Sequence, residues 1–114
     1  MVMSFTVIKR SDGAGVSRLL IAGDLDDDTG ATLVRLILNA AEQYDVSEVV
    51  VDLQRVTFLA AAGVRALLLG RGAATDLGRN FRVVNAIGTV YQILRICGVH
   101  KTLAVTSEAG AITR

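Results

Sequence analysis

The chain has 114 residues, the usual size of one domain with one hydrophobic core. Hydrophobic residues make up 52% of it and aromatic residues only 4%, so we expect a core of aliphatic side chains, as in a sheet covered by helices. Twelve basic and eleven acidic residues form no block of either sign, which argues against partners such as nucleic acid or an anionic membrane. The single cysteine excludes an internal disulfide.

The apolar runs are far shorter than the roughly 20 residues of a membrane span, so no direct membrane insertion is expected. Residues Met1 to Arg10 alternate like a strand and lack the pattern of a signal peptide. We therefore expect a cytoplasmic protein.

The first half of the chain predicts a hairpin followed by a helix. Apolar and polar residues alternate in Phe5–Ile8 and in Arg18–Ile21, on either side of the turn Ser11–Gly15, which indicates two antiparallel strands. Gly23 is expected to end the second strand. The acids Asp26–Asp28 then precede a helix, because carboxylates stabilise helix N-termini. Its apolar face is predicted to consist of Leu33, Ile37, Ala40 and Tyr44.

The second half predicts alternating strands and helices. The β-branched run Val49–Leu53 is typical of a central strand covered on both faces. A helix is expected over Ala60–Leu77, ended by Gly78. Three shorter elements are expected after it: a strand at Phe81–Val84, a helix at Thr89–Cys97 ended by Gly98, and an optional last strand at Leu103–Val105.

This order predicts an α/β fold: one domain over residues 1–114, with a mixed β-sheet that opens with an antiparallel hairpin and is covered by three or more helices. The core is expected to extend from about residue 5 to 105. Residues 106–114 are expected to form a loosely held tail.

An acidic cluster of Asp24 and Asp26–Asp28 raises the question of a metal site. Counted from Asp24, however, the glycine and glutamate positions of a calcium-binding EF-hand loop hold Thr29 and Arg35. Helix capping explains the aspartates, so no metal and no cofactor is predicted.

Cys97 and His100 are close enough in sequence to be considered as a catalytic thiol and base. Gly98 separates them, and no third residue that would orient them is evident. We expect a buried thiol and an exposed imidazole, and no catalytic residues. An enzyme that uses this pair is the third of three functional hypotheses.

The segment from Val49 to Leu68 is the most informative of the chain. A buried strand, a short loop and a helix that starts with small residues place free backbone amides at the surface, where an anion or the backbone of a partner can approach. The alternative is a tight strand-to-helix connection without a binding role.

This segment resembles the signature of STAS domains, in particular those of anti-sigma factor antagonists. In that signature a strand with an Asp-Leu pair continues through a Val-Thr-Phe-Leu stretch into Asp-Ser-x-Gly followed by Leu or Val. Three segments carry the resemblance, which covers Phe5 to about Val105: Val49 to Leu69, Gly23 to Thr29 before the first helix, and Val90 to Val99 in the third helix. The resemblance implies a STAS fold and a non-catalytic role.

In these antagonists an anti-sigma kinase phosphorylates the serine of the signature, and the added charge releases the kinase. Here Ala60 stands at the aspartate position and Ala61 at the serine position, so this switch cannot operate. Three explanations remain open: a binder that its kinase cannot release, a regulatory relative with another switch, or a deliberately mutated sequence. Thr57 and Ser47 are the nearby hydroxyls that are candidates for an alternative phosphorylation site.

The first functional hypothesis is therefore a protein-interaction module that binds an anti-sigma factor or a kinase-like regulator. The resemblance places the partner-binding residues at Asp26, Ala60, Ala61, Ala62, Gly63, Val64 and Arg65. The alternative is a cytoplasmic STAS subunit that supports the ATPase of a membrane transport complex, for example for lipids. The oligomeric state and small-ligand binding are not predicted.

Overall fold

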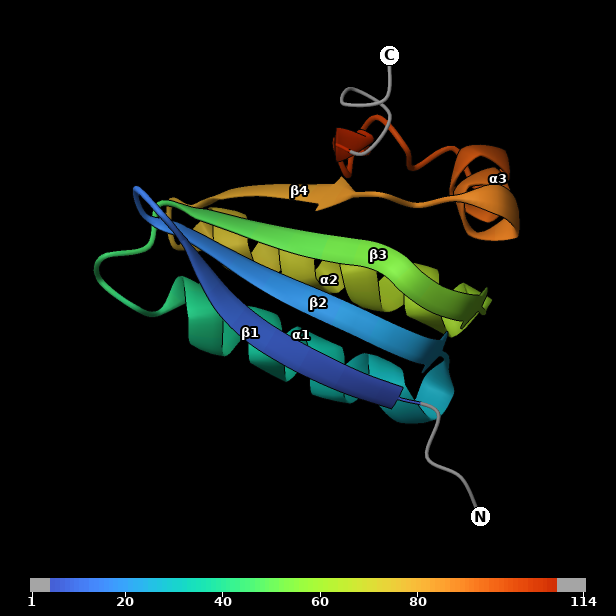
Figure 1. Ribbon diagram of the computed structural model, residues 1–114, viewed down its shortest axis with the longest axis horizontal. Coiled ribbons are helices and arrows are strands. Elements are labelled where there is room, and N and C mark those ends of the chain that lie inside the picture. Colours follow the sequence, from blue (N-terminus) through green and yellow to red (C-terminus); the bar gives the residue numbers. More distant parts are fainter. Residues whose placement is uncertain (1–4, 109–114) are drawn as a thin grey trace.

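The computed structural model describes residues 5–108 and contains one four-stranded sheet and three helices (Figure 1). In chain order the elements are β1 (Phe5–Gly13), β2 (Val16–Leu25), α1 (Asp27–Ala41), β3 (Glu48–Leu59), α2 (Ala61–Asp76), β4 (Asn80–Val84) and α3 (Gly88–Ile96). The strand order is β1-β2-β3-β4, with an antiparallel first pair and parallel second and third pairs. The predicted α/β fold, with its mixed sheet and opening hairpin, is confirmed.

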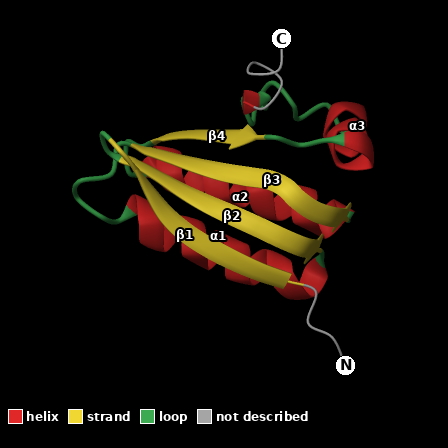
Figure 2. Cartoon of the chain, viewed as in Figure 1, coloured by secondary structure: helices red, strands yellow, loops and turns green. Residues whose placement is uncertain are grey.

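Helices α1 and α2 pack side by side on one face of the sheet (Figures 1 and 2). Alternate strand residues point to this face, among them Leu19 of β2 and Val51 of β3, and meet Ile37 of α1 and Leu67 of α2 in the core. Helix α3 follows β4 and packs near the end of the sheet, against β3. Over β1 and β2, no helix of residues 5–108 covers the opposite face of the sheet (Figure 1).

Strands β2 and β3 are longer than the sequence predicts. Gly23 has a φ of +98° at a register shift next to Asp24, so it forms an irregularity within β2 and does not end the strand. Strand β3 continues to Leu59 and pairs with β2 as far as Leu25. As a result, the beginning of α2 lies beside the beginning of α1.

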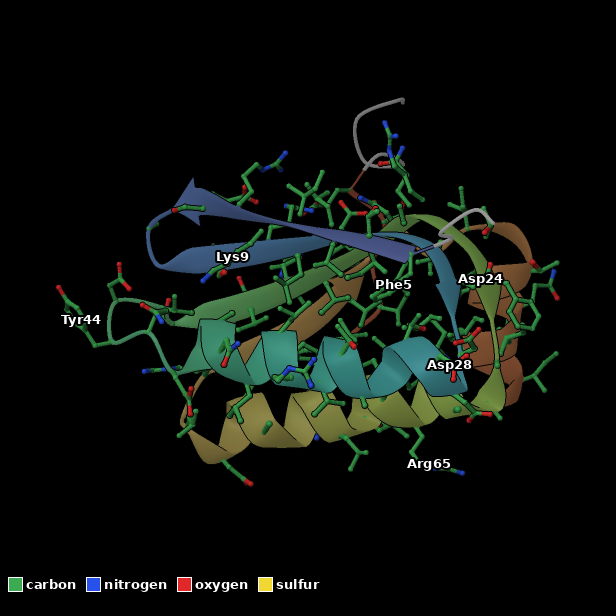
Figure 3. All side chains as sticks on the ribbon, turned by 90° about the horizontal axis from the view of Figure 1, so that it is seen from below. Phe5, Lys9, Asp24, Asp28, Tyr44 and Arg65 are labelled. Carbon is green, nitrogen blue, oxygen red and sulfur yellow. The ribbon has the colours of Figure 1, made fainter. Side chains whose placement is uncertain are left out.

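Tyr44 does not belong to the buried face of α1, although its spacing in the sequence predicts that it does. The helix ends at Ala41, and the side chain of Tyr44 is 93% exposed on the loop that leads to β3. That prediction was wrong because the hydrophobic period continues past the point where the helix stops. Figure 3 shows Tyr44 at the end of the molecule remote from Asp24 and Asp28.

The segment after α3 lies along the free edge of β4. The optional strand at Leu103–Val105 is reduced to an isolated bridge between Val84 and Thr106, although Leu103 is fully buried and its carbonyl accepts a hydrogen bond from the amide of Val83. Residues 106–108 are thus held against the sheet. The remainder of the predicted tail, residues 109–114, lies outside the described residues.

A cluster of ion pairs around the buried side chain of Arg18 joins distant parts of the chain. The guanidinium donates to Asp12 at 2.6 Å, to Asp52 at 2.9 Å and to Glu108 at 2.8 Å. These hydrogen bonds hold the pKa of the Asp12 and Glu108 carboxyls below their ordinary values. The cluster therefore ties the hairpin, the central strand and the C-terminal segment together.

No helix within residues 5–108 has both the length and the apolar character needed to cross a bilayer.

Candidate partner-binding site at the start of helix α2

The candidate site lies where the parallel strands β2 and β3 end. Ala60 connects β3 to α2, and its amide donates to the carbonyl of Leu25 at 3.0 Å, so the two strand ends are fixed to each other. Figure 3 shows Asp24 and Asp28 at this end of the molecule, where Arg65 projects outward from the helix layer. The fold therefore gathers the predicted site residues from the starts of both helices at one end.

The N-terminus of α2 has no side-chain cap. Ala60 has the extended backbone of an N-cap residue, with φ −92° and ψ 168°, but its methyl group accepts no hydrogen bond. Its carbonyl accepts from the amides of Gly63 at 2.9 Å and Val64 at 3.1 Å. Within the described residues, the amides of the first two helical positions, Ala61 and Ala62, have no acceptor. Since Ala61 is exposed and Ala62 partly exposed, both amides are available to an external acceptor.

Gly63 and Val64, both predicted as partner-binding residues, lie beneath this surface. A Cβ atom on Gly63 would collide with the carbonyl oxygen of Leu25 and would lie 2.8 Å from a methyl group of Leu59. Val64 is 6% exposed and packs in the core. These two residues bring α2 close to the end of β2 and thereby position the exposed alanines.

The N-terminus of α1, in contrast, is capped by its own side chains. The carboxylate of Asp26 accepts hydrogen bonds from the amides of Asp28 at 3.0 Å and Thr29 at 3.2 Å. The hydroxyl of Thr29 in turn accepts from the amide of Asp26 at 2.9 Å, which completes a capping box. The capping role predicted for the aspartates is confirmed for Asp26. Residues 5–108 hold no group of three or more His, Cys, Asp or Glu side chains that is arranged to hold a metal ion.

A shallow groove of about 200 Å³ separates the two helix starts. Its lining comprises Asp26, Asp27, Gly30, Ala31, Val34, Ala62, Arg65, Ala66 and Leu69. Arg65 is exposed and forms no ion pair with any described residue, and Leu69 is 57% exposed. The groove thus has acidic groups on the α1 side and one unpaired cation on the α2 side.

Of the two hydroxyls considered for phosphorylation, only Thr57 is near this site. It is exposed in β3, three residues before Ala60, and its hydroxyl donates to a carboxylate oxygen of Asp24 at 3.3 Å. Ser47 immediately precedes the other end of β3, so the full length of that strand separates it from the site. A phosphate on Ser47 would not touch the start of α2.

An apolar residue near the site was not identified from the sequence. Phe58 at the end of β3 is 53% exposed. The register shifts of β3 against β2 disturb the simple alternation of inward and outward residues, so the sequence did not show which of the neighbours Phe58 and Leu59 would be buried. Exposed aromatic residues are common anchors in protein interfaces, which makes Phe58 a candidate contact.

The pair of Cys97 and His100 does not have the expected burial. Cys97 is exposed, and His100 is partly buried, with a buried Nδ1 atom that has no hydrogen-bond partner in the described structure. The expectation of a buried thiol and an exposed imidazole was wrong, because α3 ends at Ile96 and its buried stripe stops at Leu94. No hydrogen bond joins the two side chains.

Comparison with known families supports the resemblance noted in the sequence. Residues 8–106 match the family model described as "Mlab, STAS domain". No curated protein matches the chain by sequence at a significant level.

Solved structures of antagonists and of a transporter-associated protein share the fold. An anti-sigma factor antagonist from Mycobacterium paratuberculosis is 27% identical, with a TM-score of 0.76 over 90% of this chain and 86% of that one. The anti-sigma factor antagonist SpoIIAA in its unphosphorylated form is 18% identical, with a TM-score of 0.74 over 94% of this chain and 93% of that one. A sulfate transporter family protein from Wolinella succinogenes is 19% identical, with a TM-score of 0.72 over 85% of this chain and 80% of that one.

Proposed function

This chain belongs to the STAS domain family, and on that premise we propose that it is a non-catalytic, cytoplasmic protein-interaction module that binds its partner at the start of α2. The observation that carries the proposal is the uncapped helix start, where the exposed amides of Ala61 and Ala62 have no acceptor among the described residues. A carboxylate or carbonyl group of a partner can supply the missing acceptor.

The surroundings of the helix start favour a protein partner over a small anion. Arg65 offers an unpaired guanidinium on the same helix, and the exposed side chains of Phe58 and Leu69 offer apolar anchors nearby. Asp26 and Asp27 add negative charge across the groove. A surface with small residues, an apolar rim and both signs of charge suits a partner with complementary charges and one or two protruding apolar side chains.

The partner we propose is an anti-sigma factor or a kinase-like regulator, bound without phosphoserine control. Ala61 has no hydroxyl, and no phosphate can be transferred to it. The hydroxyl of Thr57 is bonded to the carboxylate of Asp24, so a phosphate there would introduce about two negative charges next to an existing one. We expect the interaction to persist under conditions that phosphorylate related antagonists.

A capture experiment with two baits tests this proposal. The chain and its Ala61→Glu variant, each purified and checked for folding, are incubated with lysate of the native host, and bound proteins are identified by mass spectrometry. We expect a kinase-like or anti-sigma protein on the unmodified chain, with depletion on the variant, and no phosphate on the recovered bait. Equal capture by both baits would exclude Ala61 from the interface, and phosphate on Thr57 would contradict constitutive binding.

A second candidate function is a STAS subunit of a membrane transport complex. It is favoured by the likeness to the sulfate transporter family protein. The same capture experiment separates the candidates, because this function predicts an ATPase or permease subunit among the bound proteins. Neighbouring genes for a permease and an ATPase would support it, whereas genes for sigma factors and kinase-like proteins would support the first proposal.

A further inference from the structure

The sheet face that turns away from α1 and α2 carries a groove of about 410 Å³. Figure 1 views this face, and over β1 and β2 none of the described helices covers it. The groove is lined by Thr6, Ile8, Arg10, Leu20, Ile21, Ala22, Asp52, Gln54 and Arg55. Its volume is within the range of about 300–1,000 Å³ that is typical of small-ligand sites. This groove is separate from the one between the two helix starts.

An apolar strip runs across the floor of the groove. Ile8 of β1 is paired with Leu20 of β2, and both side chains belong to the lining. Ile8 is 62% exposed, which is a large exposure for an isoleucine in a sheet. The strip therefore offers apolar area that is covered neither by α1 nor by α2.

The unpaired charge in the groove is positive. Arg55 is exposed and its guanidinium has no hydrogen bond or ion pair with a described residue, whereas Arg10 is paired with Asp12 at 2.9 Å. Asp52, the carboxylate in the lining, is already bonded to Arg18 at 2.9 Å and to the amide of Gln54 at 3.0 Å. A ligand in this groove consequently meets apolar side chains and one free guanidinium.

We propose that this groove binds an aliphatic monocarboxylate, a medium-chain fatty acid, with its carboxylate on Arg55 and its chain along Ile8 and Leu20. Guanidinium and carboxylate match each other in a planar, two-bonded arrangement. The hydrocarbon chain covers the apolar strip, whereas a purely ionic ligand would leave this strip exposed to water. The groove lies on the sheet face opposite α1 and α2, so the proposal does not depend on the partner-binding site.

Decanoate, kept below its micelle-forming concentration, is the probe that tests this proposal. It is titrated into the full ¹⁵N-labelled chain, and amide chemical shifts are followed by NMR. We expect saturable shifts centred on the lining residues of β1, β2 and β3. Acetate has the carboxylate without the long chain, and decanol has the chain without the carboxylate. Each should bind at least tenfold more weakly than decanoate.

Two variants and a matched control locate the contacts. Arg55→Gln should weaken decanoate binding at least fivefold, and Ile8→Thr, which keeps a β-branched residue in the strand, should weaken it at least threefold. Arg35→Gln makes the same change at an exposed, unpaired arginine of α1 and should leave the affinity within twofold. The NMR spectra also report whether each variant is folded.

Several results would overturn the proposal. These are an absence of saturable shifts, equal binding of acetate or inorganic phosphate, and equal affinity of the Arg55→Gln and Arg35→Gln variants. A glutamate-rich peptide that binds in place of decanoate would identify a protein segment as the occupant. Shifts of the same residues that depend on protein concentration without added ligand would identify a second copy of the chain.

Discussion

The starts of α1 and α2 lie at the same end of the sheet but are built in opposite ways. At α1, Asp26 and Thr29 satisfy the first amides through a capping box. At α2, Ala60 occupies the same position and supplies no side-chain acceptor, and the first turn contains no acidic residue. Because a cap is worth about 1 kcal/mol, its absence from a helix of 16 residues indicates that packing holds α2 in place without it, and the first amides of α2 stay free.

The variant with the largest expected effect on stability tests whether packing, and not a cap, holds the start of α2 in place. Gly63→Ala should lower the free energy of unfolding by about 1–3 kcal/mol, because the new methyl group collides with the carbonyl of Leu25. Gly72→Ala is the control: in the same helix, nothing lies within 4 Å of its added Cβ, and a gain of about 0.5–1 kcal/mol is expected. Urea unfolding of both variants gives the comparison. Equal stability changes would show that the close approach at Gly63 is unimportant.

Removal of the cap from α1 should have the next largest effect. Asp26→Ala should lower the free energy of unfolding by about 1 kcal/mol, because two helix amides lose their acceptor. Asp28→Ala removes a charge from the same first turn without removing a capping bond, and should cost about 0.3–0.5 kcal/mol. If thermal unfolding shows the same loss for both, the charge and not the cap stabilises α1.

Introduction of a cap at α2 should make the two helix starts alike. Ala60→Ser places a hydroxyl where it can accept from the amide of Ala62, and should raise the free energy of unfolding by about 0.5–1 kcal/mol. Since that amide is then occupied, the affinity for the partner should fall. Thermal unfolding and a binding titration on the same sample test both parts. A more stable variant with unchanged affinity would show that the partner does not use this amide.

Acid unfolding distinguishes the charges that the fold uses from those it leaves unpaired. Glu108 has a lowered pKa in the folded chain because it accepts a hydrogen bond from Arg18. It therefore contributes stability above its unfolded-state pKa, and this contribution is lost as the pH falls through the lower, folded-state pKa. Glu108→Gln should cost about 0.2–1 kcal/mol at neutral pH and almost nothing in acid. A pH-independent cost would rule out the ion pair as its cause.

The smallest effect on stability is expected at Arg65, which has no ion partner among the described residues. Arg65→Gln should change the free energy of unfolding by less than about 0.5 kcal/mol, yet it should weaken partner binding. Unfolding and binding measurements on one preparation check both. A clear loss of stability would mean that the fold, and not the partner, uses this charge.

Much of the fold could be predicted because the hydrophobic pattern is strong. The run Val49–Leu53 indicated the central strand, and the aspartates before α1 indicated its cap. The extension of β2 past Gly23 could not be predicted, because a glycine that ends a strand and a glycine at a bulge within a strand look alike in sequence. The burial of Cys97 was misjudged because its spacing continues the stripe of α3 beyond the residue where the helix ends.

Only part of the candidate site could be predicted from the sequence. The family resemblance pointed to Ala60–Arg65 as the candidate site. It did not indicate that Ala61 is exposed whereas Gly63 and Val64 are buried. This difference depends on how closely α2 approaches Leu25, which is a tertiary contact. The exposure of Phe58 and the ion pairs of Arg18 with distant carboxylates likewise arise from strand register and from contacts across the chain.

The central claim is that the uncapped start of α2 binds the partner. The most direct test is a calorimetric titration of the purified partner with the unmodified chain, with Ala61→Glu and with Thr75→Glu. Both variants add one carboxylate to exposed positions of α2, the first at its start and the second near its end. We predict at least fivefold weaker binding for Ala61→Glu and a change within twofold for Thr75→Glu. Unchanged affinity of a folded Ala61→Glu variant would contradict the account.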